Sequence, residues 1–191
     1  MKDTKQKLMN AMIDLVYTKG YRAVTTKEVA QEAGVSEKTL FRHFPTKLAL
    51  LEHACNQLYY AAEFQFLIEK TLVFDIEKDL TTILTKYHEI VNENRKIFII
   101  SLKEEEHLPE LRRCILKHPQ SLLKDLEHYL DKMVEMKKIR AVDTKTTAFL
   151  LITSQYGAFI NHIDSERNFP DITLANYIRV SVETFVKGLK P

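Results

Sequence analysis

Basic and hydrogen-bonding side chains occupy one side of a helix that the sequence predicts at residues 37–44. Lys38 and Arg42 are four residues apart, as are Thr39 and His43, and this spacing places the members of each pair on one face of a helix. Ammonium, guanidinium, hydroxyl and imidazole groups can donate hydrogen bonds to phosphates and to base edges. These four residues therefore predict a surface that reads nucleic acid.

The same helix has an apolar side, formed by Leu40 and Phe44. These residues can pack on Val29 and Val35, so one face is core and the other is free to bind.

Local signals predict how this helix is positioned. Thr25 and Glu28 form a capping box that starts a preceding helix, Gly34 suits the left-handed residue that ends it, and Ser36 is the next N-cap. Two short helices joined by a tight turn containing glycine are typical of a helix-turn-helix DNA reader. The alternative is an ordinary helical hairpin, which does not require the caps, the glycine and the basic second helix together.

The segment around these helices resembles a known family. Residues 25–51 read TTKEVAQEAGVSEKTLFRHFPTKLALL, which is similar to the DNA-binding signature of the TetR family of bacterial repressors. The resemblance implies an N-terminal three-helix DNA-binding domain, a helical ligand-binding and dimerisation domain, and repression relieved by a small molecule. Phe41 departs from the usual tyrosine, so a phenolic phosphate contact is lost and the ring is left for packing or for a thymine methyl group.

We expect a homodimer to present two copies of the helix at residues 37–44 to double-stranded DNA. The predicted base readers are Glu37, Lys38, Thr39 and His43, the predicted phosphate contacts are Thr26, Lys27, Arg42 and Lys47, and Phe41 lies on the same surface. In the resembled family a lysine at the place of Lys47 contacts the DNA backbone.

The distribution of charge agrees with this interpretation. The chain has a net charge of +2 from 28 basic and 26 acidic residues. Residues 1–50 hold nine Lys and Arg against five Asp and Glu, which leaves 19 against 21 for the remainder. The basic surplus therefore lies in the predicted reader, where DNA binding requires it.

Periodic apolar segments predict an all-α fold of about nine helices, with a helix-turn-helix domain at residues 1–46 and a helical effector-binding and dimerisation domain at residues 47–191. The predicted helices outside the reader cover Thr4–Lys19, Thr46–Leu67, Ile76–Asn92, Arg95–Glu105, Pro109–Met136 with an interruption at His118–Pro119, Asp143–Ile163 and Asp171–Leu189.

The last two predicted helices are apolar around more than one face, and this surplus predicts a symmetric partner. The predicted dimer residues are Phe149, Ile152, Tyr156, Phe159, Ile160, Tyr177, Val182 and Phe185. The alternative is that both helices are central within one subunit. The resemblance favours the dimer, because it implies a four-helix bundle formed by the last two helices of each subunit.

Aromatic and apolar residues after residue 50 supply candidates for a small-molecule pocket. The predicted ligand residues are Tyr60, Phe64, Tyr87, Phe98, Leu102, Leu126, Gln155 and Tyr156, with Ser101 and Asn161 as further polar contacts. Such a pocket would be largely neutral and would favour a hydrophobic or aromatic effector. For any single residue of this set, a place in the core is the alternative.

Two other functional classes were weighed. The chain has no HExxH pair, Cys/His cluster or GxSxG elbow, so we predict no enzyme, no metal and no cofactor. The acidic run at residues 104–106 is expected to be a solvated helix end. A helical adaptor protein is the remaining alternative, but it leaves the basic and hydrogen-bonding residues of the reader unexplained.

The remaining features concern the compartment. Cys55 and Cys114 are isolated and fit a reducing cytosol, and neither a signal peptide nor an apolar segment of membrane-spanning length is apparent. We therefore expect a soluble, cytoplasmic protein.

Overall fold

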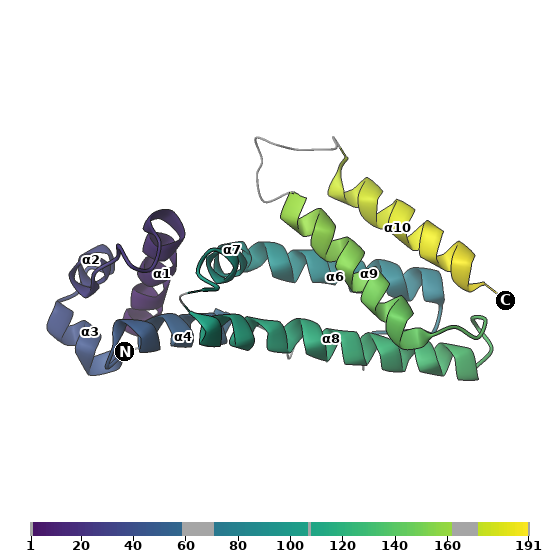
Figure 1. Ribbon diagram of the computed structural model, residues 1–191, viewed down its shortest axis with the longest axis horizontal. Coiled ribbons are helices and arrows are strands. Elements are labelled where there is room, and N and C mark those ends of the chain that lie inside the picture. Colours follow the sequence, from purple (N-terminus) through teal and green to yellow (C-terminus); the bar gives the residue numbers. More distant parts are fainter. Residues whose placement is uncertain (1, 59–70, 107, 162–171, 191) are drawn as a thin grey trace. The chain divides into compact units, whose positions relative to one another are not determined.

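The computed structural model describes residues 2–58, 71–106, 108–161 and 172–190, and the nine elements within them are all α-helices (Figure 1). The helices are α1 (Lys2–Lys19), α2 (Thr26–Glu32), α3 (Glu37–His43), α4 (Lys47–Leu58), α6 (Ile76–Glu93), α7 (Arg95–Lys103), α8 (Pro109–Glu135), α9 (Thr144–Asn161) and α10 (Leu174–Leu189). The prediction of an all-α fold is confirmed. The part of the predicted helix Thr46–Leu67 that follows Leu58 lies outside the described residues.

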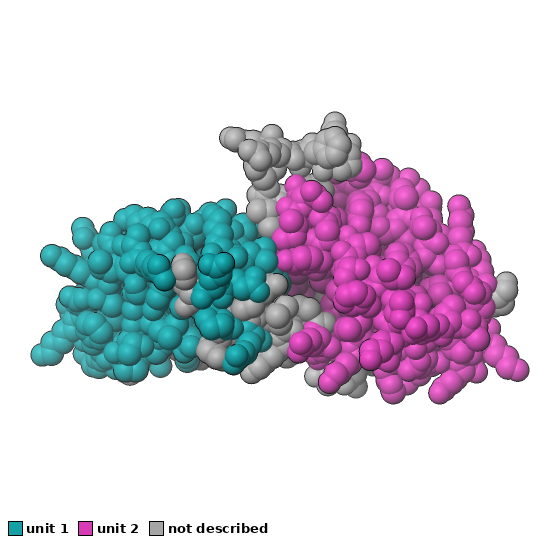
Figure 2. Space-filling view, viewed as in Figure 1, with its two compact units in different colours: residues 1–59, 94–117 teal, residues 60–93, 118–191 magenta. Residues whose placement is uncertain are grey.

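The chain divides into two compact units, which Figure 2 shows in different colours. The first contains residues 1–59 and 94–117, and the second contains residues 60–93 and 118–191. Helix α7 therefore belongs with the N-terminal helices, although it is distant from them in sequence. The functional division expected at residue 46 stays a prediction, and the compact units do not follow it because α4 and α7 both pack on α1.

Helix α1 is the centre of the first unit, where it packs against α2, α4 and α7. Leu8 and Met12 of α1 and Leu40 of α3 have no solvent exposure. The small α2–α3 hairpin therefore depends on helices outside it for its core, because seven-residue helices are too short to be stable alone.

The second unit is built around α6, which packs against α9 and α10. The buried side of α6 includes Leu80, Ile83 and Leu84, and also the carboxylate of Asp79. Asp79 accepts hydrogen bonds from the Val73 amide at 3.0 Å and from the Tyr129 hydroxyl at 2.8 Å. Burial, and then the bond to Asp79, raise the pKa of the Tyr129 phenol. The buried carboxylate thus has partners from outside its own helix.

Helix α8 runs without a break through Pro119, so the predicted interruption at His118–Pro119 is wrong. A proline inside a helix removes one backbone donor and crowds the preceding turn. Leu111 before it and Leu122 and Leu126 after it are buried, and this burial offsets the cost. The two compact units divide at this point of the helix, between residues 117 and 118.

No helix in the described parts of the chain has both the length and the apolar character needed to cross a membrane.

Candidate nucleic-acid interface

The start of α2 has the capping box that the sequence predicts. The Thr25 hydroxyl accepts from the Glu28 amide at 3.2 Å, and the Glu28 carboxylate accepts from the Thr25 amide at 2.8 Å. Glu28 also pairs with Lys19 of α1 at 2.9 Å. The bond from Lys19, followed by those from Thr25, lowers the pKa of Glu28 from its ordinary 4.5 to about 2. The cap therefore joins α2 to α1 as well as satisfying the free amides of α2.

The turn between α2 and α3 also has the predicted form. Gly34 has a φ of +68°, a left-handed conformation that residues with a Cβ adopt only at a cost. The Val35 amide donates to the Ala30 carbonyl at 2.9 Å, and the Ser36 side chain caps α3 by accepting from the Thr39 amide at 3.2 Å. These bonds set the direction in which α3 leaves the turn.

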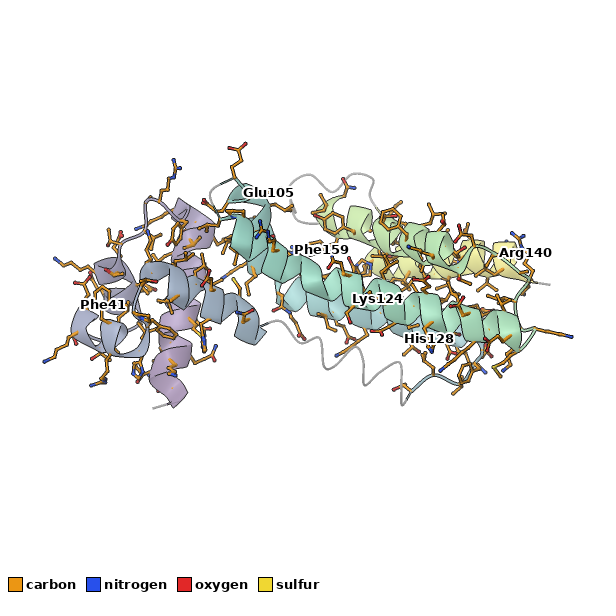
Figure 3. All side chains as sticks on the ribbon, turned by 60° about the horizontal axis from the view of Figure 1, so that its bottom comes forward. Phe41, Glu105, Lys124, His128, Arg140 and Phe159 are labelled. Atoms are coloured by element: carbon orange, nitrogen blue, oxygen red, sulfur yellow. The ribbon has the colours of Figure 1, made fainter. Side chains whose placement is uncertain are left out.

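Helix α3 turns one side inward and the other outward. Leu40 and Phe44 are buried, as predicted, while Lys38 and Arg42 are exposed. Phe41 projects from α3 with 48% of its surface exposed (Figure 3). A large aromatic side chain exposed on a seven-residue helix has no packing role within the described residues.

None of the nine predicted DNA-binding residues is buried. Lys27, Lys38, Phe41 and Arg42 are exposed, and Thr26, Glu37, Thr39, His43 and Lys47 are half-buried. The described side chains thus leave every member of the set with some access to solvent.

Two of these residues are bonded to each other. The Thr26 hydroxyl donates to the Glu37 carboxylate at 2.5 Å. This bond joins the first residue of α2 to the first residue of α3 and holds the carboxylate in place before any ligand arrives. An ordered carboxylate can accept from the exocyclic amine of cytosine.

Lys47 turns its charge into the protein. Its Nζ donates to the Tyr21 and Val24 carbonyls, each at 2.8 Å, and lies 4.1 Å from the centre of the Tyr21 ring. Burial lowers the pKa of this ammonium, and the nearby Glu104 carboxylate opposes the effect. The predicted phosphate contact of Lys47 is untested, but in this structure its donors serve the loop between α1 and α2.

The acidic run at residues 104–106 corrects an expectation. Glu105 and Glu106 are exposed, as a solvated helix end requires, whereas Glu104 is only 8% exposed. The Glu104 Oε1 atom accepts from the Tyr21 amide at 2.8 Å. Composition gave no indication that one of three adjacent glutamates is buried.

The predicted ligand residues fall in both compact units. Phe98 and Leu102 belong to the first unit, and Tyr87, Leu126, Gln155 and Tyr156 belong to the second. Leu102 and Tyr156 are half-buried and the other four are buried. Tyr60 and Phe64 lie outside the described residues. Ser101 donates to its own helix at Phe98, and Asn161 is exposed and donates to Gly157.

One buried polar residue near this set was missed. His88 is 2% exposed, and its Nε2 lies 3.1 Å from Oε1 of Gln155, a pair that joins α6 to α9. Tyr87 is beside it, and burial, followed by the proximity of Tyr156, raises the pKa of the Tyr87 phenol. The signal in the sequence is a histidine on the same helical stripe as Leu84 and Val91.

The predicted dimer residues divide by exposure. Phe149 is 54% exposed, and Leu150 and Val180, on the same two helices, are 55% and 44% exposed. Phe159 (Figure 3) and Val182 are buried within the second unit. The half-buried members are Ile152, Tyr156, Ile160, Tyr177 and Phe185. The exposed apolar residues of α9 and α10 are therefore the ones available to a partner.

The described residues contain no group of three or more His, Cys, Asp or Glu side chains that could hold a metal ion.

Comparison with known proteins places this geometry. Residues 8–54 match the family described as bacterial regulatory proteins, tetR family. Over 189 residues the chain is 30% identical to the uncharacterized HTH-type transcriptional regulator YvkB of Bacillus subtilis, a match that covers 99% of this chain and 98% of that protein.

Two solved structures illustrate the similarity of fold. The fatty acid degradation regulator FadR of Bacillus halodurans matches with a TM-score of 0.76 at 16% identity, covering 97% of this chain and 95% of that one. The TetR family transcriptional regulator PfmR of Thermus thermophilus matches with a TM-score of 0.71 at 18% identity, covering 96% of this chain and 99% of that one. The shared fold extends over nearly the whole chain.

Proposed function

Because this chain belongs to the TetR family and is a DNA-binding transcriptional regulator, we propose that it is a homodimeric repressor, released from a pseudo-palindromic operator by a small hydrophobic or aromatic effector. Its place of action would be the cytoplasm, where its DNA lies. The observation that carries the proposal is the outward face of α3, with exposed Lys38, Phe41 and Arg42 above a fully capped turn.

The DNA contacts that we propose follow from position on α2 and α3. Lys38, Thr39 and His43 would read base edges together with Glu37, whose carboxylate Thr26 holds at the start of the helix. Lys27 and Arg42 are exposed and would contact phosphates. In a dimer, two copies of α3 would enter successive major grooves about 34–36 Å apart.

The proposed dimer uses α9 and α10. Support comes from the exposed apolar residues Phe149, Leu150 and Val180, because a monomer gains nothing by leaving such side chains in water. A two-fold axis would place this face of one subunit against the same face of the other.

The proposed effector site lies in the α6–α10 part of the chain. Tyr87, Gln155 and Tyr156 would supply aromatic surface with few polar groups, and the buried His88 would join them. Effector binding would favour a tilt of α4, which would change the spacing of the two reading helices. Coupling of this kind is typically about 1–3 kcal/mol.

Selection from a randomised duplex library, at two salt concentrations, tests the proposal. We expect the purified full chain to recover an inverted repeat. Thr39→Ala should change the preferred bases, whereas Arg42→Gln should weaken binding to all sequences and reduce the salt dependence by about one unit. If folded wild-type protein enriches no motif at either salt concentration, the DNA-binding proposal fails and the adaptor alternative takes its place.

A further inference from the structure

A buried carboxylate connects helix α7 to the loop that precedes the reader. Glu104 is the residue that ends α7, where its amide donates to the Ile100 carbonyl at 2.9 Å. Its side chain is turned inward, and Oε1 accepts from the Tyr21 amide at 2.8 Å. Glu104 and Tyr21 are 83 positions apart, so the bond ties a late helix to the start of the chain.

The loop fits closely against this carboxylate. Gly20 has a φ of +81°, and a Cβ atom added there would lie 3.2 Å from Glu104 Oε1. That distance is shorter than an ordinary contact, and the left-handed backbone adds its own cost for any residue with a side chain. Glycine at position 20 is what allows Glu104 to approach the Tyr21 amide.

The opposite side of the same loop is held by Lys47. The Tyr21 and Val24 carbonyls accept from its Nζ, while the Tyr21 amide donates to Glu104. The loop is thus fixed between an anion and a cation, each bonded to the backbone group of matching polarity.

These contacts reach both ends of the α2–α3 reader. Val24 is followed by Thr25, the N-cap of α2, and Lys47 is the first residue of α4, which begins three residues after Phe44, the C-cap of α3. A displacement of the loop would therefore act on the reader at its entrance and, through Lys47, at its exit.

Other polar contacts between α7 and α1 are exposed. Lys96 pairs with Asp14, and the Lys103 ammonium lies 5.4 Å from the centre of the Tyr17 ring. Exposed ion pairs contribute little because water screens them. Glu104 makes its bond where water is mostly excluded, so its geometry is the most sharply determined of the three.

We infer that Glu104 is a positioning residue for DNA recognition, which sets the orientation of α3 through the Tyr21 amide and Lys47 and passes movement of the end of α7 to the reader. The inference rests on the proposed DNA-binding function. It assigns a role in specificity to a side chain that touches neither DNA nor effector.

The test compares reach with charge at position 104 in the full-length chain. Glu104→Gln keeps an oxygen acceptor at the same reach, whereas Glu104→Asp keeps the charge but is one methylene too short. The measured quantity is the ratio of two affinities, for the inverted repeat recovered by selection and for a duplex of scrambled sequence. Glu106→Ala removes an exposed carboxylate two residues away and serves as the control.

We expect Glu104→Asp to lower this ratio about ten-fold, the order of one hydrogen bond to a charged group. Glu104→Gln and Glu106→Ala should leave it within about two-fold of the wild-type value. Gly20→Ala should lower it as Glu104→Asp does, because its Cβ meets the carboxylate. A simple loss of stability would reduce both affinities together and leave the ratio unchanged.

Three results would overturn the inference. Equal ratios for wild type and Glu104→Asp would show that the bond does not orient α3. Retention by Asp with loss by Gln would show that charge near Lys47, and not the bond to Tyr21, is what matters. Absence of any specific binding by the wild-type protein would remove the proposed function itself, and with it the inference.

Discussion

Replacing Lys47 by methionine separates two roles that sequence and structure assign to this residue. As a phosphate contact, Lys47 would act only when DNA is present. As a donor to the Tyr21 and Val24 carbonyls, it acts in the free protein. Methionine keeps most of the length of the side chain and removes the charge and the donors.

The structure sets the size of the effect on stability. Each hydrogen bond to a charged group contributes about 1.5–3 kcal/mol, and Lys47 makes two of them. The side chain is half-buried, so water replaces part of the loss, and removal of the ammonium also ends the desolvation that lowers its pKa. We therefore expect Lys47→Met to reduce the free energy of unfolding by about 2 kcal/mol. For a chain of this length, that lowers the melting temperature by about 4–8 °C.

Two measurements check this expectation. Calorimetry of the free protein gives the melting temperature, and titration with the selected operator over a range of salt gives the slope of log affinity against log salt. We expect the first to fall and the second to stay at the wild-type value. Lys38→Met is the control, since its exposed ammonium on α3 should leave the melting temperature unchanged.

The opposite outcome would refute the reasoning. An unchanged melting temperature, with a salt slope smaller by about 0.9 for each Lys47 that leaves the complex, would mean that the ammonium leaves the loop and binds phosphate.

Three further predictions follow from other contacts. Glu28→Gln keeps the capping geometry and removes the charge; because the pKa of Glu28 falls from 4.5 to about 2 on folding, the wild type should be more stable above pH 4.5, and this advantage should vanish as the pH falls toward 2. Urea unfolding along this series measures it, and a difference that does not change with pH would contradict it. Phe149→Glu should give monomers by sedimentation, because it places a charge on the exposed face of α9, whereas the exposed Lys124→Glu on α8 should stay dimeric (Figure 3); a dimer for both would place the interface elsewhere. Tyr129→Phe should cost about 1–3 kcal/mol by removing a donor from the buried Asp79 carboxylate, and a denaturation midpoint equal to that of the wild type would contradict this.

The sequence alone determined the features that depend on residues close together in the chain. The capping box at Thr25, the left-handed Gly34 and the cap at Ser36 could be predicted because each depends on a few adjacent residues and on the backbone conformations they allow. The all-α fold could be predicted because an apolar stripe repeats with the period of a helix. The family could be recognised because its signature lies within one such local unit.

Only the tertiary structure decided where the polar groups of distant segments meet. Lys47 and Glu104 are exposed in most helical arrangements of this sequence, and they turn inward here because the loop after α1 presents two carbonyls to one and an amide to the other. His88 similarly required a partner 67 positions away. Phe159 and Val182 are apolar like Phe149, and only packing determines which of them remain available to a second subunit. Periodicity gives the side of a helix that is apolar, but the neighbour that covers it is a property of the whole fold.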